Sequence, residues 1–169
     1  MSVPEFRPTS ILRRLAEAGV DFLVIGGFAA IAHGSVLLTY DLDVVPAPDE
    51  ENLAVLGTVL VALEARLRGV PDDVPFVADG RTLRRIEVLT LSTTDGPLDV
   101  LRAPSGAPGY ATMRARALRV PIAGVEVLVT SLEDLLAMKR AAGRPKDLIA
   151  IEELEAIARL RLRMEREAR

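Results

Sequence analysis

Residues 22–45 read Phe22-Leu-Val-Ile-Gly-Gly-Phe-Ala-Ala-Ile-Ala-His-Gly-Ser-Val-Leu-Leu-Thr-Tyr-Asp41-Leu-Asp43-Val-Val45, and this stretch decides the fold. One apolar run ends at Gly26 and Gly27, and a second carries Asp41 and Asp43. Because strand side chains alternate, the two carboxylates are expected on one face, where they form a paired oxygen surface. Such a surface suits hard divalent cations such as Mg²⁺. The stretch therefore predicts a strand, a tight glycine turn and a site for metal and phosphate.

The composition limits the chemistry that the chain can perform. The 169 residues are half hydrophobic, which is enough for one sizeable core. The chain has no cysteine and one histidine. This excludes disulfides, zinc-thiolate sites, cysteine nucleophiles and most histidine-based metal cages. Any catalysis must therefore use carboxylates, Lys, Arg, hydroxyls and backbone amides.

One segment has the length of a membrane helix. From Phe22 to Tyr40, 19 residues include no Asp, Glu, Lys or Arg. Glycines and polar residues interrupt the run with turn signals, so we expect no membrane span. The first eight residues contain no apolar run of the signal-peptide type. A cytoplasmic location is the resulting expectation.

The charges are distributed unevenly along the chain. Residues 1–80 carry 5 Lys or Arg against 12 Asp or Glu, a net −7, and residues 81–169 carry 16 against 12, a net +4. This division fits an acidic metal site that faces basic residues, with a polyanionic ligand between them. Charges that only cover exposed helix faces would give the same counts. The overall charge of −3 argues against nonspecific nucleic-acid binding.

Periodicity, caps and breakers divide the chain into helices and strands. Helices are expected over residues 10–18, 27–33, 49–67 and 131–142 and from about 145 to near the C-terminus, and strands over 21–25, 42–45, 84–91, 98–102, 117–121 and 125–129. Ser10 and Ser131 are the expected N-caps of two of these helices. Residues 70–80 read as a loop. The pattern predicts an α+β fold with a small mixed β-sheet flanked by helices, in one domain over residues 1–169 with C-terminal helices from about residue 131.

Three aspartates are the candidate metal ligands. Asp41 and Asp43 border a strand of apolar residues, and buried carboxylates are costly unless they bind something. Asp99 lies in the apolar strand Leu98-Asp99-Val100 and would be the third carboxylate if that strand neighbours the first pair. It could bind metal or accept the proton of an attacking hydroxyl. The alternatives are that the pair lies at an exposed strand start and that Asp99 only closes a turn.

Other residues are candidates for binding phosphate. Gly26 and Gly27 would let a phosphate approach the backbone at a helix N-terminus, although turns need glycine in any case. Thr39 could donate to a phosphate or fill a strand edge. Lys139 is the expected counter-charge for a metal-bound triphosphate, although basic residues are also ordinary in a last helical turn. His33 reads as a helix C-terminal residue rather than a catalytic base.

Gly26-Gly27, thirteen further residues, Asp41-Leu-Asp43 and a later strand with Asp99 together resemble the minimal nucleotidyltransferases of the DNA polymerase beta superfamily. The family pattern is an apolar residue, Gly, Gly or Ser, a short helix, Asp-x-Asp on a strand and a third carboxylate downstream. The resemblance implies the polymerase-beta-like nucleotidyltransferase fold. It also implies that the glycines contact a triphosphate and that the three aspartates form the catalytic metal site.

The resemblance covers about residues 20–147, because Lys139 to Asp147 is similar to a segment in bacterial members related to AbiEii-type toxins. It implies that Lys139 and Asp147 support the nucleotide. The chain departs from the pattern where many relatives have Arg before the aspartate pair, since Leu37 and Leu38 stand there. It also has Gly27 where relatives often have Ser.

The implied reaction transfers a nucleoside monophosphate from an NTP such as ATP to a hydroxyl group, with release of pyrophosphate. The implied cofactor is Mg²⁺ or Mn²⁺, and the acceptor is an RNA end, a protein side chain or a small molecule. The toxin-like relatives imply an antitoxin partner. An antibiotic-modifying enzyme is the nearest alternative. A degenerate domain that binds a nucleotide or a partner protein without turnover is a second alternative, and a structural domain whose match to the pattern is accidental is a third.

Overall fold

The computed structural model describes residues 5–71 and 74–169. The elements, in chain order, are α1 (Pro8–Glu17), β1 (Phe22–Ile25), α2 (Gly26–His33), β2 (Leu42–Pro46), α3 (Glu50–Ala62), β3 (Arg66–Leu67), α4 (Gly80–Arg85), β4 (Val88–Thr93), β5 (Gly96–Leu101), α5 (Tyr110–Arg116), β6 (Leu118–Ile122), β7 (Val125–Val129), α6 (Leu132–Ala142) and α7 (Pro145–Glu167).

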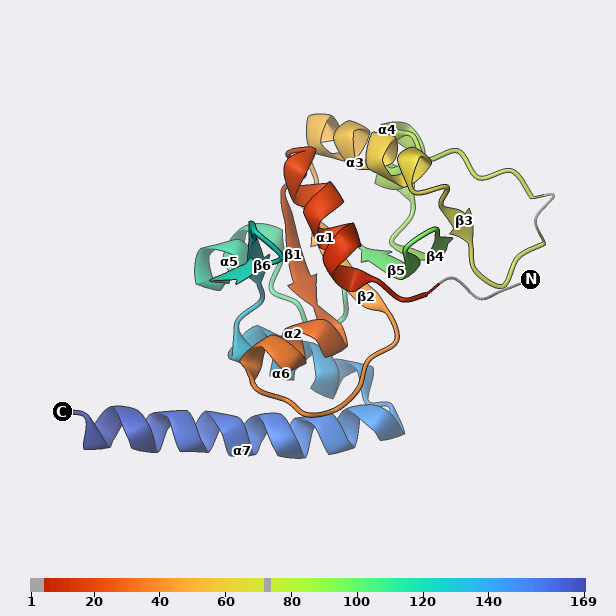
Figure 1. Ribbon diagram of the computed structural model, residues 1–169. Helices are drawn as coiled ribbons and strands as arrows, with labels where there is room; N and C mark the ends of the chain where they lie inside the picture. Colours follow the sequence, from red (N-terminus) through yellow and green to blue (C-terminus); the bar gives the residue numbers. More distant parts are fainter. Residues whose placement is uncertain (1–4, 72–73) are drawn as a thin grey trace.

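A mixed sheet with helices around it organises the chain (Figure 1). Within the described residues its seven strands follow the order β3-β4-β5-β2-β1-β7-β6. β1 is antiparallel to β2 and parallel to β7, and β2 is parallel to β5. The α+β prediction, with its small mixed sheet between helices, is confirmed. The parallel pairing of β2 with β5 brings together the carboxylates described in the next subsection.

Both faces of the sheet centre are buried, which explains the unbroken apolar sequence of β1. Val24 faces a core that includes residues of α1 and α3. Leu23 and Ile25 face the opposite side and pack with Met113 of α5 and Met138 of α6. A strand covered on both faces has no polar alternation. The position of β1 at the sheet centre fixes where the chain turns into α2.

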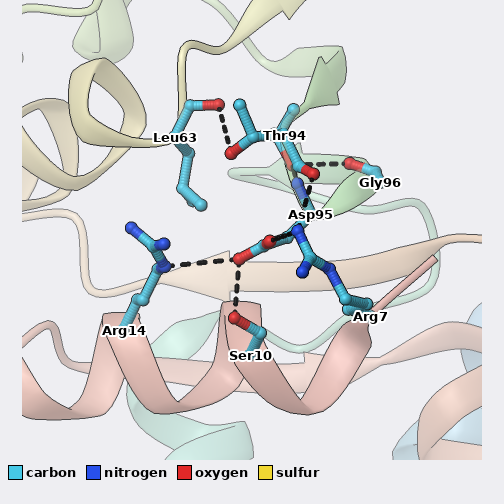
Figure 2. A network of polar contacts seen from close by, with 8 residues as sticks. Arg7, Ser10, Arg14, Leu63, Thr94, Asp95 and Gly96 are labelled. Atoms are coloured by element: carbon cyan, nitrogen blue, oxygen red, sulfur yellow. Dashed lines mark hydrogen bonds and ion pairs between the residues drawn. The ribbon is translucent and has the colours of Figure 1, made fainter. Parts of the chain in front are cut away.

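The buried Asp95 holds α1 against the turn between β4 and β5 (Figure 2). Its carboxylate pairs with Arg7 at 2.5 Å and with Arg14 at 3.3 Å, and it accepts a hydrogen bond from Ser10 Oγ at 2.6 Å. The prediction that Ser10 caps the helix is wrong, because α1 begins at Pro8 after the N-cap Arg7. Proline at the first helical position has its φ already set for a helix, so the helix starts two residues earlier.

The helix expected over 49–67 ends sooner. α3 stops at Ala62, and the backbone of Glu64 turns into the left-handed region with a φ of 50°. Ala65 N donates to the Leu60 carbonyl at 3.0 Å, which closes the helix end. Arg66–Leu67 then form β3 on the sheet edge. The leucine spacing continues past the helix because Leu63 and Leu67 still pack against the same core.

The strand expected over 84–91 is also displaced. Asp79 caps α4 by accepting from Thr82 N at 2.7 Å, and β4 starts only at Val88. The strands expected over 117–121 and 125–129 are β6 and β7, which pair as a hairpin, and the expected Ser131 cap of α6 is observed. α5 was not anticipated. No helix or strand lies in the described part of the predicted loop before residue 80.

α7 lies across one end of the molecule, and its C-terminal end extends beyond the other elements (Figure 1). It packs with α6 and with α2. The charge-free segment 22–40 forms β1, α2 and the following loop, so it is not one long helix. In the described ranges, no helix is both long enough and apolar enough to span a membrane.

Candidate active site

Three carboxylates converge where β2 and β5 lie side by side. Asp43 on β2 stands in register with Asp99 on β5, and Asp41 immediately precedes β2. One oxygen from each lies within 4.8 Å of the others. The condition set for Asp99, that its strand neighbours the strand of the first pair, is therefore met. Three hard oxygen donors at this spacing fit a divalent cation.

The electrostatics of the cluster favour a bound cation. Burial, and then repulsion from Asp41 and Asp99, raises the pKa of Asp43 from 3.8 to about 7. Burial also raises the pKa of Asp99, against the opposing charge of Arg68. These carboxylates are costly to ionise together unless a positive charge lies between them. A divalent ion would supply that charge.

The two glycines at the start of α2 allow the carboxylates to approach. A Cβ on Gly26 would lie 2.0 Å from Asp43 Oδ2, and the φ of Gly26 is +65°. A Cβ on Gly27 would lie 2.6 Å from Thr39 Oγ1. Both positions therefore require glycine for packing, whether or not a phosphate binds. The first amides of α2 have no side-chain cap, and Gly26 and Gly27 line the cavity described below.

The loop between α2 and β2 is anchored at both ends. Thr39 Oγ1 donates to Asp41, with 3.1 Å to Asp41 Oδ1, so Thr39 orients the first carboxylate. Ser35 Oγ donates to Glu153 of α7, and Val36 N donates to Glu153 Oε1 at 2.9 Å. α7 thereby fixes the position of the loop that carries Asp41.

Arg68, just after β3, forms an ion pair with Asp99. Its backbone N–H donates to the Thr90 carbonyl at 2.9 Å, and Thr90 stands opposite Asp99 in the ladder. The guanidinium therefore reaches across β4 to β5. Its Nε atom is buried and has no hydrogen-bond partner among the described residues. Arg68 holds Oδ1 of Asp99.

A cavity of about 300 Å³ opens beside the carboxylates. Its lining combines the start of α2, the loop before β2, the end of α6 and the start of α7. The lining residues that carry positive charge are Lys139, Arg144 and Lys146. Acidic ligands on one wall and cations on the other make the cavity suitable for a polyanion that arrives with a metal ion.

Asp147, predicted to support a ligand, lines this cavity but is engaged with its basic wall. It accepts from Arg144 Nε at 2.7 Å and lies 3.7 Å from Lys139 Nζ. Burial opposes its ionisation, but the hydrogen bonds and charge of Arg144 outweigh burial and lower its pKa. It also accepts from the Arg144 backbone N–H at 3.2 Å and so caps α7. Asp147 therefore orients the two cations.

A second cavity, of about 500 Å³, adjoins the first at the carboxylates. The two cavities share Gly26, Asp43, Asp99, Lys139 and Arg144. The remaining lining of the second cavity is mostly apolar and comes from β1, β4, β5, α6 and residues 103–105, with Glu87, Thr90 and Ser105 as polar residues. Asp43 and Asp99 thus border two spaces, which could hold the donor and the acceptor of a group transfer.

Comparison with known proteins identifies the fold. No protein-family model matches the chain, and no curated protein matches it significantly in sequence. Among solved structures, the lincosamide antibiotic adenylyltransferase LnuA, solved with lincomycin bound, aligns with a TM-score of 0.57 and 15% identity over 88% of this chain and 94% of that one. The antibiotic-resistance factor ANT(2'')-Ia aligns with a TM-score of 0.54 and 20% identity over 94% of this chain and 91% of that one. The chain has the nucleotidyltransferase fold.

A third structure with the nucleotidyltransferase fold, an antigenic nucleotidyltransferase-like protein from Paracoccidioides brasiliensis, aligns with a TM-score of 0.54 and 21% identity. This chain is covered over 90% of its length and that one over 73%. The fold predicted from the glycine pair and the three aspartates is confirmed. In this fold the carboxylates occupy the centre of the sheet, and α6 and α7 supply the basic wall.

His33, interpreted as a helix C-terminal residue, has that position in the nucleotidyltransferase fold seen here. Its Nε2 lies 2.8 Å from the Thr130 carbonyl, and Arg161 Nη1 lies 3.2 Å from its Nδ1. Burial lowers the pKa of His33. The neutral ring therefore donates through Nε2 and accepts through Nδ1, which ties α2 to β7 and α7 and keeps His33 out of the reaction.

Sequence reasoning did not find Arg68 or Glu153. Arg68 directly follows the helix expected over residues 49–67, and nothing in that pattern signals that the chain has already turned into the sheet. Glu153 meets Ser35 across 118 residues of sequence, and no local pattern signals that contact. Lys139, at the end of α6, was found from the sequence. Arg140 next to it instead pairs with Glu155 at 2.7 Å.

Proposed function

We propose that the protein is a metal-dependent nucleotidyltransferase that transfers a nucleoside monophosphate from an NTP to a hydroxyl acceptor and releases pyrophosphate. The observation that carries the proposal is the convergence of three carboxylates within 4.8 Å, between a cavity with a basic wall and a second, largely apolar cavity. The nucleotidyltransferase fold supports it. The single domain and the roles of the site residues are part of this proposal.

Asp41 and Asp43 would hold the metal, and Asp99 would complete the site. Mg²⁺, with Mn²⁺ as the substitute, would polarise the reacting phosphate and stabilise the leaving oxygen. Lys139, Arg144 and Lys146 would neutralise the triphosphate from the opposite wall. The first amides of α2, at Gly26 and Gly27, would donate to phosphate oxygens.

Asp99 is one of the three clustered carboxylates and lines both cavities. Its Oδ2 would accept the proton of the attacking hydroxyl while Arg68 holds Oδ1. Thr39 orients Asp41, and Glu153 holds the loop that carries both. Each of these residues acts on the position of a carboxylate rather than on the substrate.

A small molecule is the acceptor that we favour. The second cavity has a volume of about 500 Å³, which is the usual size of a small-molecule site. Two of the similar proteins are antibiotic-related. The LnuA structure contains lincomycin, and a second structure of ANT(2'')-Ia contains adenylyl-2''-tobramycin. An RNA end and a protein side chain are the other candidates.

A toxin role with an antitoxin partner, ATP as the preferred donor and a cytoplasmic location stay predictions from the sequence. A binding domain without turnover has the same fold and the same cavities. It would differ by retaining Mg²⁺-dependent NTP binding without product formation.

The test is incubation with each NTP labelled at the α-phosphate, with Mg²⁺ and with separated cellular RNA, protein and small-molecule fractions. We expect label in one fraction, dependence on metal and loss in the Asp41→Asn/Asp43→Asn double variant. Label in the small-molecule fraction supports the favoured acceptor. NTP binding without transfer to any fraction supports the binding domain, and absence of both contradicts the proposal.

A further inference from the structure

The cavity beside the carboxylates has a charged end and an apolar end. Lys146 lies in the first turn of α7, and its charge acts on Asp43, so the start of α7 marks the charged end. Ile149 follows about one helical turn later, roughly 5 Å along the axis. It lines the same cavity, together with Leu37 and Leu38 of the loop before β2. The apolar end therefore lies away from the metal ligands.

Two large side chains at this end are strongly exposed. Leu38 is 81% exposed and Ile149 is 62% exposed. Apolar side chains at the mouth of a cavity gain free energy when an apolar ligand surface covers them. A nucleobase has such a surface, and it is attached to the triphosphate that the charged end fits. Continuity with the basic wall therefore points to the base rather than to a protein as the occupant.

The polar groups near the apolar end are already engaged. Ser35 Oγ donates to Glu153 and accepts from Leu37 N at 3.2 Å. Val36 N donates to Glu153 at 2.9 Å. Thr39, next to Leu38, is the other polar side chain of this loop that lines the cavity, and its hydroxyl donates to Asp41 at 3.1 Å. No side chain there is left to recognise the hydrogen-bonding edge of a base.

We propose that Leu38 and Ile149 hold the nucleobase of the bound NTP by apolar contact alone, so that ATP, GTP, CTP and UTP bind with similar affinity. The inference rests on the proposed function for the triphosphate end of the cavity. A site that hydrogen-bonds its substrate rejects analogues without the matching group by large factors, whereas apolar contact discriminates weakly. The same residues therefore define a donor site with little base preference.

Calorimetry with Mg²⁺ tests this, with the α,β-methylene analogues of the four NTPs and inorganic tripolyphosphate as ligands. We expect the four analogues to bind within about tenfold of one another, and each more tightly than tripolyphosphate. A larger preference for one base would overturn the proposal, because such a preference requires a protein group that hydrogen-bonds to the edge of that base.

Leu38→Ala and Ile149→Ala should each weaken all four analogues by roughly fivefold and leave tripolyphosphate unchanged. Leu162→Ala is the control, since Leu162 is an exposed leucine near the far end of α7. An equal loss for tripolyphosphate, or no loss for the analogues, overturns the placement of the base. If the variants instead weaken self-association in sedimentation and spare nucleotide binding, a second copy covers these residues and the proposal is wrong.

The design separates the two levels of the argument. If tripolyphosphate binds with Mg²⁺ and the analogues bind no tighter, the base site fails and the proposed function stands. If neither binds to the wild-type protein, the proposed function fails and the base site fails with it.

Discussion

Replacement of Asp43 by asparagine should stabilise the metal-free protein while it removes the proposed metal site. Asp43 is the carboxylate whose pKa is raised to about 7, first by burial and then by repulsion from Asp41 and Asp99. Asparagine keeps the shape that Gly26 accommodates and removes the charge. The gain in stability and the loss of metal binding therefore have one physical cause.

The magnitude follows from the difference between a pKa of about 7 in the folded protein and the ordinary value of 3.8. At 1.36 kcal/mol for each pH unit, ionised Asp43 costs about 4 kcal/mol in the folded state, and relaxation reduces this to roughly 2. The folded pKa lies above the unfolded one. The stability that the folded protein gains from keeping Asp43 neutral is therefore fully present below pH 3.8 and is lost as the pH rises through about 7.

Urea unfolding in EDTA measures the effect. At about pH 8, Asp43→Asn should raise the free energy of unfolding by about 2 to 4 kcal/mol, and at about pH 5 most of that gain should disappear. Mg²⁺ should then stabilise the wild-type protein and leave the variant unchanged. Glu152→Gln, at an exposed carboxylate on α7, is the matched control. A variant less stable than wild type at about pH 8, or one that Mg²⁺ stabilises equally, would refute the reasoning.

Three further predictions concern the residues around the cluster. Arg68→Met should lower kcat by roughly 10- to 100-fold with little change in NTP affinity, because it acts through Asp99; a steady-state assay that shows only a KM effect would contradict this. Gly27→Ala should destabilise the fold by about 1 to 3 kcal/mol in urea unfolding, because its Cβ meets Thr39 at 2.6 Å. Glu153→Ala should weaken Mg²⁺-dependent NTP binding by roughly tenfold in calorimetry through release of the loop, whereas unchanged affinity would show that the loop holds its position without it.

The centre of the site was accessible from the sequence because its signals are local. An apolar strand, a glycine pair and two aspartates at strand spacing specify β1, the start of α2 and β2 without knowledge of the rest. Asp99 was identified as a candidate from its apolar neighbours alone. Its convergence with Asp43 depends on the pairing of β2 with β5, and no local sequence signal establishes that pairing.

The surroundings of the site depend on contacts that the sequence does not record locally. The leucine spacing of α3 continues through Leu63 and Leu67, since both pack on one core, and it concealed the turn at Glu64 that delivers Arg68. At Glu64, tertiary packing overrode a reasonable helical pattern. The start of α1 was missed for a different reason: Pro8 begins the helix before Ser10, whose hydroxyl instead donates to Asp95.

The most direct test of the account is to count the two products of the reaction together, with an NTP labelled at the α-phosphate and the acceptor fraction that takes up label. The account predicts one pyrophosphate released for each nucleoside monophosphate transferred, with both products dependent on Mg²⁺ and both lost in Asp41→Asn. Release of inorganic phosphate in place of pyrophosphate, or transfer that persists in Asp41→Asn, would contradict it.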